Sequence, residues 1–276
     1  MTTDILTHVV NGDGPPLLLL NGGLMSYSAW EPLAAVIARS CRVVRCDFRG
    51  QLMSPGEAPT TFAGHADDLL RLMDALALDS AHIAGASFGA LAGMTLAARA
   101  PGRLRSLVAI TATDRMTPEM DAGSARMREA CRVALDGGDG GRVMDLVNPA
   151  TWSPEFLTAQ SSVLAARRQA VAMLPRAWFV GLEQLLASMD GLDLRALLPG
   201  ITCPTLIIGG DQDVTFPVEH SRALAAQIPR ARLEIVPDGY HGLVVEHAPR
   251  VIQLLLDFVR DVETARAARP SAGATL

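Results

Sequence analysis

Short apolar runs alternate with amphipathic helical segments along most of this chain of 276 residues. The run "PLLLLNGG" is almost wholly apolar at its start, which is typical of a strand buried on both faces of a parallel sheet. In "FAGHADDLLRLMDALAL" the apolar residues recur at three- and four-residue spacing, which is typical of a helix packed on one face. The alternation predicts an α/β fold, a mostly parallel sheet flanked by helices. The expected strands are residues 5–10, 15–22, 41–48, 81–87, 104–112, 204–213 and 231–239, and the expected helices are residues 28–39, 62–78, 88–100, 218–228 and 248–262.

The alternation stops in the middle of the chain. From residue 114 to residue 199 the sequence is helical in pattern and punctuated by glycine, with no convincing strand. We therefore expect an all-helical insertion, residues 114–199, in an α/β core made of residues 1–113 and 200–264. The remaining tail, residues 265–276, is small and polar, and we expect it to be disordered.

One strand-to-helix junction carries a serine between two glycines, in "GASFG" (residues 85–89). The pattern G-x-S-x-G is typical of a tight turn in which only small neighbours fit and which exposes the serine hydroxyl above the sheet. The N-terminus of the following helix favours negative charge that develops there. Ser87 is therefore a candidate nucleophile, although a junction of small residues with an incidental serine would give the same letters.

A serine nucleophile needs a base, and the base needs a group that orients it. Two later strands end in loops with suitable residues, since "GGDQDVTFP" holds Asp211 and Asp213 and "VPDGYHG" holds His241. The order serine, acid, histidine, each at the carboxyl end of a strand, is the one that serine hydrolases of this architecture use. His220, one helical turn beyond the acid loop, is the competing base.

Taken together, these motifs resemble the α/β-hydrolase superfamily over essentially the whole chain. "DFRGQLMS" resembles the family's D-x-R-G-x-G-x-S turn, with Leu52 in place of the second glycine. Asn21 in "LLLLNGG" stands where the family usually has histidine. "GGDQDVTFP" resembles the family's G-x-x-D-x-x-x-P acid loop, which implies that Asp213, rather than the turn residue Asp211, partners His241.

The resemblance also implies an oxyanion hole and a helical cap. The backbone N–H groups of Gly23 and Phe88 would bind the oxyanion of a tetrahedral intermediate. The insertion falls where this superfamily commonly carries a cap over the active site. Leu24, Met25 and Trp178 are the candidate substrate-binding residues, in an apolar pocket with few polar groups.

Further cap side chains are candidates for the same pocket. The apolar ones could equally belong to the core of the cap, and the basic ones could meet a substrate carboxylate or lie on a solvated helix face. They are Trp152, Met173, Phe179 and Met189, together with Arg167 and Arg168.

Three kinds of function remain open. The first is hydrolysis of an ester or lactone through an acyl-enzyme on Ser87, and Asn21 resembles the strand-Asn motif of 3-oxoadipate enol-lactone hydrolases. The second is a C–C bond hydrolase, or a cofactor-free lyase or dioxygenase, in which Ser87 is secondary; the H-G-x-G-P-G loop of bacterial C–C hydrolases is absent. The third is a non-catalytic binding module, which a complete triad disfavours. Serine rather than aspartate at the nucleophile position disfavours dehalogenases and epoxide hydrolases.

Composition excludes several partners. The net charge of −5 and the lack of a basic block argue against nucleic acid and anionic membranes. The four cysteines lack metal-ligand spacing and no lysine is present, so we expect neither a metal nor another cofactor. The N-terminal residues do not resemble a signal peptide, and no apolar run could span a bilayer. We expect a cytoplasmic monomer or homodimer that acts on a small molecule.

Overall fold

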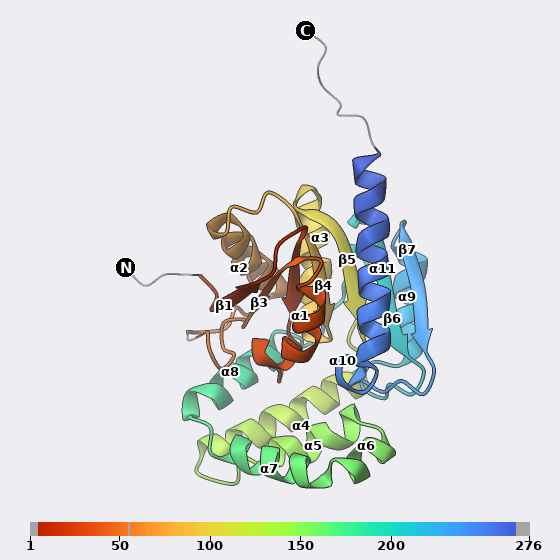
Figure 1. The fold of residues 1–276 in the computed structure, drawn as a ribbon. Coiled ribbons are helices and arrows are strands. Elements are labelled where there is room, and N and C mark those ends of the chain that lie inside the picture. The colour runs from red at the N-terminus through yellow and green to blue at the C-terminus, as the bar shows by residue number, and fades with distance from the viewer. Residues whose placement is uncertain (1–4, 55, 269–276) are drawn as a thin grey trace.

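A sheet of seven strands in the order β1-β3-β2-β4-β5-β6-β7 forms the centre of the computed structural model, which describes residues 5–54 and 56–268 (Figure 1). β1 pairs antiparallel with β3 and the other pairs are parallel, which confirms the predicted sheet. The strands are β1 (His8–Asn11), β2 (Pro16–Leu20), β3 (Arg42–Cys46), β4 (Ala81–Ala86), β5 (Leu104–Ile110), β6 (Thr205–Gly210) and β7 (Ala231–Val236).

Helices cover both faces of this sheet. β2 is buried along its whole length, and its side chains alternate between the two faces. Leu17 and Leu19 pack in the apolar cluster formed with helices α1 (Glu31–Ile37) and α11 (Ala248–Ala267). Leu18 and Leu20 pack in the cluster formed with α2 (Phe62–Ala75), α3 (Phe88–Arg99) and α9 (Val218–Gln227). The core also contains helix α10 (Leu243–Glu246).

The helical insertion lies between β5 and β6 and forms a separate layer beyond the ends of the strands, below the core in Figure 1. At its two ends the chain pairs with itself, through an antiparallel bridge between Arg115 and Asp193. The Met116 N–H donates to the Leu192 carbonyl at 2.7 Å, and the Leu194 N–H donates to the Asp114 carbonyl at 2.9 Å. We call residues 114–116 and 192–194 the neck. The cap helices are α4 (Pro118–Leu135), α5 (Arg142–Thr151), α6 (Pro154–Ala159), α7 (Ser161–Ala172) and α8 (Arg176–Ala187).

The cap touches the core directly through backbone at α8. A Cβ added to Gly181 would lie 1.9 Å from the carbonyl oxygen of Gly50, so only glycine allows this approach. Nearby, the side-chain oxygen of Gln184 accepts a hydrogen bond from the Ala58 N–H at 3.0 Å. These contacts fix α8 against the turn that follows β3.

Some boundaries differ from the predicted ones. β1 begins at His8, later than predicted, and a 3-10 turn at Tyr27–Trp30 precedes α1. α11 continues to Ala267, so the first residues of the predicted disordered tail are helical. The reason is that "ETARA" consists mainly of good helix formers, and Arg266 pairs with Glu263 one turn earlier. Residues 269–276 of that tail lie outside the described residues.

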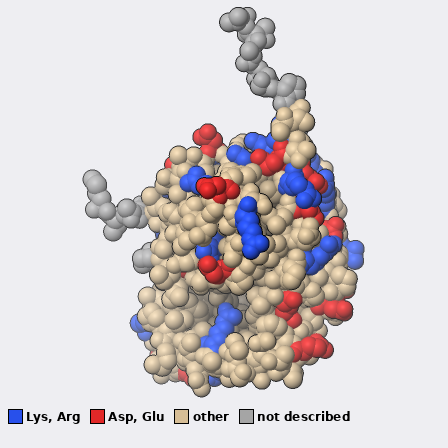
Figure 2. Space-filling view, viewed as in Figure 1, with Lys and Arg blue, Asp and Glu red and all other residues tan. Residues whose placement is uncertain are grey.

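The surface carries charges of both signs. Figure 2 shows arginine and carboxylate side chains interspersed over the face in view. Within residues 5–54 and 56–268, no helix is both long and apolar enough to cross a membrane.

Candidate active site

Ser87 occupies the turn between β4 and α3 in a backbone conformation that few side chains adopt. Its φ is 51° and its ψ is −118°, and such a conformation costs about 1–3 kcal/mol. The flanking glycines are needed because the turn brings backbone into contact with backbone. A Cβ on Gly85 would lie 2.4 Å from the Gly89 carbonyl, and a Cβ on Gly89 would lie 2.4 Å from the carbonyl oxygen of Leu20. The tight turn thus places Ser87 in the lining of a cavity.

The structure brings the three residues of the predicted triad into one hydrogen-bonded chain. Ser87 Oγ lies 3.0 Å from His241 Nε2, and His241 Nδ1 lies 2.9 Å from Asp213 Oδ2. The Asp213 side chain is 1% exposed, and its Oδ1 accepts hydrogen bonds from the N–H groups of Thr215 and Phe216, both at 2.9 Å. The Phe216 ring also packs edge-on against the imidazole, with centroids 5.3 Å apart. The carboxylate holds the imidazole proton on Nδ1, which leaves Nε2 free to accept a proton from the serine.

Neither competing residue joins this chain. Asp211 is exposed, and its carboxylate accepts a hydrogen bond from the adjacent Gln212 at 3.3 Å. His220 pairs with a different carboxylate, Asp114, at 2.6 Å. The geometry therefore joins Asp213 to His241, while the part that each residue plays in a reaction stays a prediction.

Gly23 and Phe88, whose N–H groups are the predicted oxyanion donors, line the same cavity as Ser87. Within the described part of the chain, neither N–H donates to a protein acceptor. Phe88 is the first residue of α3, so its N–H lies at the positive end of that helix. A Cβ on Gly23 would meet no atom within 4 Å, so a ligand can approach the backbone there.

A buried amide holds the loop that carries Gly23. Gln51 Nε2 donates to the carbonyl oxygens of Gly22, at 2.8 Å, and of Gly23, at 3.2 Å. In a trans peptide the C=O and N–H bonds point in opposite directions, so this contact turns the Gly23 N–H away from Gln51. The amide is itself fixed, because its Oε1 accepts from the Phe48 N–H and from Asn21 Nδ2.

Asn21 and Asp47 extend this network. Asn21 is fully buried and also donates to Asp47 Oδ1 and to the Cys46 carbonyl, both at 2.9 Å. Burial raises the pKa of Asp47, although hydrogen bonds from the N–H groups of Met53 and Tyr27 oppose the rise. The departure of Asn21 from the family's histidine thus lies in the support of the Gly23 loop and outside the triad.

A cavity of about 500 Å³ lies between core and cap, over Ser87 and His241. The core supplies its floor, and α4, α5 and the C-terminal end of α8 supply its roof. Its walls are mainly apolar, which suits a small organic ligand. No group of three or more His, Cys, Asp or Glu side chains with the arrangement of a metal site occurs among the described residues.

The sequence matches the family described as alpha/beta hydrolase fold over residues 15–248. The chain belongs to this family. A protein of Stutzerimonas stutzeri (strain A1501) named "Putative carbamate hydrolase RutD" is 31% identical over 254 residues, which cover 89% of this chain and 92% of the relative. The enol-lactonase from Burkholderia xenovorans LB400 superimposes with a TM-score of 0.82 and 27% identity, covering 92% of this chain and 96% of that one. A thermophilic esterase from Thermogutta terrifontis, with malate bound, superimposes with a TM-score of 0.79 and 27% identity, covering 93% of each chain.

Of the three predicted substrate contacts in this α/β hydrolase, only Leu24 lines the cavity. Met25 turns back on its own loop, where its sulfur lies 3.2 Å from the Gly22 nitrogen. Trp178 lies edge-on to Phe179 and packs against the apolar core. Both side chains are thus occupied elsewhere.

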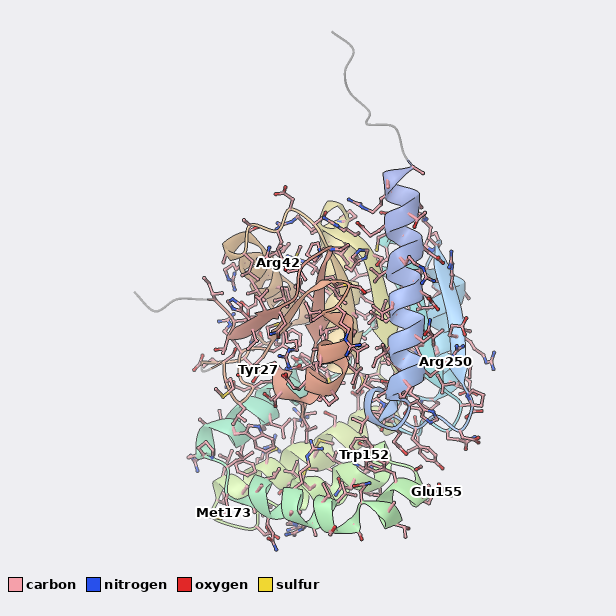
Figure 3. The ribbon with its side chains drawn as sticks, in the orientation of Figure 1. Tyr27, Arg42, Trp152, Glu155, Met173 and Arg250 are labelled. Atoms are coloured by element: carbon pink, nitrogen blue, oxygen red, sulfur yellow. The ribbon has the colours of Figure 1, made fainter. Side chains whose placement is uncertain are left out.

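The other cap candidates also separate. Met189 lines the cavity, whereas Met173 is 84% exposed at the outer edge of the cap (Figure 3). Trp152 is buried where the cap meets the core, and a Cβ on Gly242, next to His241, would meet its ring at 2.3 Å (Figure 3). Trp152 therefore supports the histidine loop from the cap side.

The two arginines considered for a substrate carboxylate lie elsewhere. Arg168 forms ion pairs with Asp139, at 2.5 Å, and with Asp145, at 2.7 Å. Arg167 is exposed on the same helix and does not line the cavity. The guanidinium that does line it belongs to Arg126 of α4.

Sequence analysis missed the wall that α4 supplies. Met116, Met120 and Met127 line the cavity and recur at helical spacing, and this methionine stripe was the available signal. Ser124 lies on the same face, and its buried Oγ has no hydrogen-bond partner among the described residues. The loop at residues 214–217 completes the wall.

Proposed function

We propose that this α/β hydrolase is a serine hydrolase that cleaves a carboxylic ester or a lactone of a small organic molecule. The observation that carries the proposal is the hydrogen-bonded chain from Asp213 through His241 to Ser87, at the floor of a cavity of about 500 Å³. The similarity to an enol-lactonase and to an esterase supports the choice of substrate class.

In the first half of the reaction, Ser87 Oγ attacks the substrate carbonyl carbon while His241 Nε2 takes the hydroxyl proton. The carbonyl π-bond electrons move to the oxygen, which becomes an oxyanion. The N–H groups of Gly23 and Phe88 would stabilise that charge, and one such donor contributes about 3–4 kcal/mol in a serine protease. His241 then donates its proton to the leaving oxygen as the C–O bond breaks, and an acyl-enzyme remains.

In the second half, water attacks the acyl carbon and gives a proton to His241. The tetrahedral intermediate collapses, the carboxylic acid leaves and His241 returns the proton to Ser87. Asp213 stays ionised throughout and stabilises the imidazolium that forms twice in the cycle.

The name of the S. stutzeri relative favours a carbamate as a second candidate substrate. Attack by Ser87 on a carbamate carbonyl would expel the alcohol and leave a carbamoyl-enzyme, with the same proton transfers through His241. The ester and carbamate candidates thus share one site and differ in which acyl group the cavity accepts.

A fluorophosphonate probe and a substrate panel test the proposal. The probe should label the wild-type protein stoichiometrically at Ser87, and Ser87→Ala should abolish the labelling. Short-chain esters, lactones, carbamates and vinylogous diketones should then be assayed in parallel with the Ser87→Ala protein. Turnover that survives in Ser87→Ala, or turnover of the diketones alone, would contradict an acyl-enzyme mechanism on esters.

A further inference from the structure

A second histidine–carboxylate pair lies beside the cavity and takes no part in the proposed acyl transfer. Asp114 follows β5, the strand next to the one that carries Ser87, and His220 lies in the first turn of α9, just after β6 and its loop. Because β4, β5 and β6 run parallel, their carboxyl ends meet at one edge of the sheet. The pair therefore lies at the same end of the sheet as the nucleophile.

The carboxylate orients the imidazole. His220 Nδ1 lies 2.6 Å from Asp114 Oδ1, and Asp114 Oδ2 accepts a hydrogen bond from Arg115 at 2.8 Å. Burial alone would raise the pKa of Asp114, but the hydrogen bonds and charges of His220 and Arg115 outweigh it and lower the pKa. Asp114 Oδ1 accepts the hydrogen bond from Nδ1–H of His220, and in the tautomer that this contact selects Nε2 presents a lone pair.

That lone pair faces the cavity. His220 lines the cavity and Asp114 does not, so the ring edge exposed to a ligand is the one directed away from Asp114. Nε2 makes no hydrogen bond within the described residues, and it is not among the fully buried polar atoms that lack a partner. Nine of the residues that line the cavity are methionine, leucine or valine, and the others include the polar residues Thr117, Ser124 and Thr215.

We infer that His220 is a substrate-recognition residue, whose Nε2 accepts a hydrogen bond from an O–H or N–H group of the substrate away from the carbonyl that Ser87 attacks. Asp114 is a positioning residue that acts through His220. The inference rests on the proposed function and narrows its substrate class to esters or lactones that carry a hydroxyl or N–H group. A ligand without such a group would leave Nε2 desolvated and unpartnered, and sites of this kind discriminate strongly against it.

The cavity also holds two charged side chains, Glu119 and Arg126, both from α4. Glu119 lies in the first turn of α4, where its pKa is lowered by the backbone N–H and by Thr117. A substrate carboxylate would be drawn to Arg126 or to a protonated His220, and this alternative belongs in the test.

Four chromogenic esters separate these chemistries. They are p-nitrophenyl hexanoate, its 3-hydroxy and 6-hydroxy derivatives, and mono-p-nitrophenyl adipate. The two hydroxyl positions sample different depths of the cavity, and the adipate ester carries a carboxylate. The measured quantity is the ratio of kcat/KM for each substituted ester to that for the hexanoate.

Two substitutions of His220 separate recognition from pairing. In His220→Asn the amide nitrogen takes the place of Nδ1, so the hydrogen bond to Asp114 persists while the atom at Nε2 is lost. In His220→Gln a polar atom reaches the place of Nε2. His8→Asn, the same change on the edge strand β1, is the matched control.

We expect the wild-type protein to favour at least one hydroxylated ester over the hexanoate by about tenfold, the value of one hydrogen bond to a neutral group. The ratio should fall to about one in His220→Asn, stay above one in His220→Gln and remain unchanged in His8→Asn. Asp114→Asn should lower the ratio, because its amide no longer fixes the proton on Nδ1. Melting temperatures of all variants show whether a loss of folding contributes.

Three outcomes would overturn the inference. They are equal ratios in the wild-type protein and His220→Asn, a wild-type ratio near one for both hydroxylated esters, and a preference for the adipate ester that depends on His220. If the wild-type protein hydrolyses none of these four esters, the subsite is tested by itself; the proposed function fails as well if the lactones and carbamates of the substrate panel are also left intact. In the test of the subsite, calorimetry with hexanamide and its two hydroxyl derivatives on the Ser87→Ala protein should give the same dependence on His220, and the absence of that dependence would reject the inference.

Discussion

Ser87 can give up its proton only while His241 keeps Nε2 unprotonated, and Asp213 decides that state. The carboxylate has one oxygen for the imidazole and one for two backbone N–H groups, so each oxygen acts as an acceptor. An amide at this position could satisfy only one of these demands. The single hydrogen bond between Asp213 and His241 therefore selects the tautomer on which the proposed chemistry depends.

The substitution Asp213→Asn tests this directly. The backbone N–H groups of Thr215 and Phe216 will hold the new amide oxygen, so its NH2 will face His241 Nδ1 and move the imidazole proton to Nε2. We expect kcat to fall by about 10³- to 10⁴-fold, as when a serine protease loses the same carboxylate. Steady-state kinetics on an ester substrate measures the loss. Asp211→Asn is the matched control and should have little effect, because Asp211 is exposed; larger damage from it would mean that the wrong acid has been paired with His241.

A substitution of Gln51 tests whether its side chain supports the loop that carries Gly23. Gln51→Met keeps the volume but removes the donor to the Gly22 and Gly23 carbonyls, so the Gly23 N–H should lose its fixed direction. We expect kcat to fall by about 10- to 100-fold with little change in KM, a loss smaller than that of a whole oxyanion donor. Affinity for a boronic acid, whose adduct places an oxygen in the oxyanion hole, should fall with it. A variant with a lowered melting temperature but wild-type kcat and boronate affinity would reduce Gln51 to a structural residue.

The elements of the core could be predicted from the sequence more fully than the elements of the cap. The short buried strands allowed the sheet to be predicted, and the glycine-flanked turn allowed the position of Ser87 to be predicted, because backbone sterics leave few alternatives at such turns. The acid and the histidine came from the loops after two later strands and from the family resemblance, and the catalytic roles of all three residues stay predictions. The cap was harder. Its helices bury apolar side chains both against each other and around the cavity, and periodicity does not tell these faces apart. Trp178 thus packs against the apolar core, while methionines of α4 line the cavity. Which face of a cap helix borders the cavity depends on the distant parts of the chain that pack against that helix. The prediction that Met25 contacts the substrate is wrong for a local reason, because its flexible side chain folds back to the Gly22 nitrogen.

The packing of helix α8 against the core leads to a testable prediction. Gly181→Ala places a Cβ 1.9 Å from the Gly50 carbonyl oxygen, so α8 must move off the core. We expect a loss of roughly 1–3 kcal/mol in the free energy of unfolding, seen as a melting temperature several degrees lower. KM should rise as well, because the roof of the cavity shifts. Gly200→Ala is the control, since a Cβ there meets no atom within 4 Å; equal melting temperatures for the two variants would show that the close approach is unimportant.

Across the whole molecule, acid sensitivity follows from histidines buried in the neutral state. His65 is fully buried among the rings of Phe48, Phe62 and Phe88. Burial, helped by the charge of Arg49, lowers the pKa of His65 to about 3. As pH falls below about 6.5 the unfolded chain takes up a proton that the folded protein refuses. The contribution of neutral His65 to the free energy of unfolding is therefore fully present above pH 6.5 and is lost as the pH falls from 6.5 to about 3.

His82 contributes in the same direction, since burial lowers its pKa to about 4 even though Glu263 opposes the shift. Between its pKa in the unfolded chain and its pKa in the folded protein, each buried histidine should lower the free energy of unfolding by about 1.4 kcal/mol per pH unit. Urea denaturation at pH 7.0 and pH 5.0 should show the wild-type free energy of unfolding falling, and His65→Phe should fall distinctly less. His8→Phe, on the half-buried edge strand, is the control. An identical fall in His65→Phe would remove His65 as a source of acid sensitivity.

Deleting the cap tests its part in substrate choice. Replacing residues 117–191 by a short Gly/Ser linker keeps both strands of the neck and removes no strand of the seven-stranded sheet. We expect the product to react with a fluorophosphonate at Ser87, because the triad lies in the core, but to show a raised KM and a broader range of accepted esters. Size-exclusion chromatography must first show a monodisperse protein, because the deletion exposes apolar side chains that now pack on the cap. An unchanged KM and substrate ranking in the folded product would show that the cap does not set specificity.

The neck has a consequence for how such proteins change over time. Both crossings of the chain between core and cap are tied together by one antiparallel bridge, between Arg115 and Asp193. Whatever polypeptide lies between them begins and ends at the same two neighbouring points, regardless of its length. Insertions, losses and exchanges of whole helices can accumulate there without altering the spacing of the strands beneath. The neck thus offers a fixed point of attachment. Recombination at residues 114–116 and 192–194 can join a different helical insertion to an unchanged α/β core.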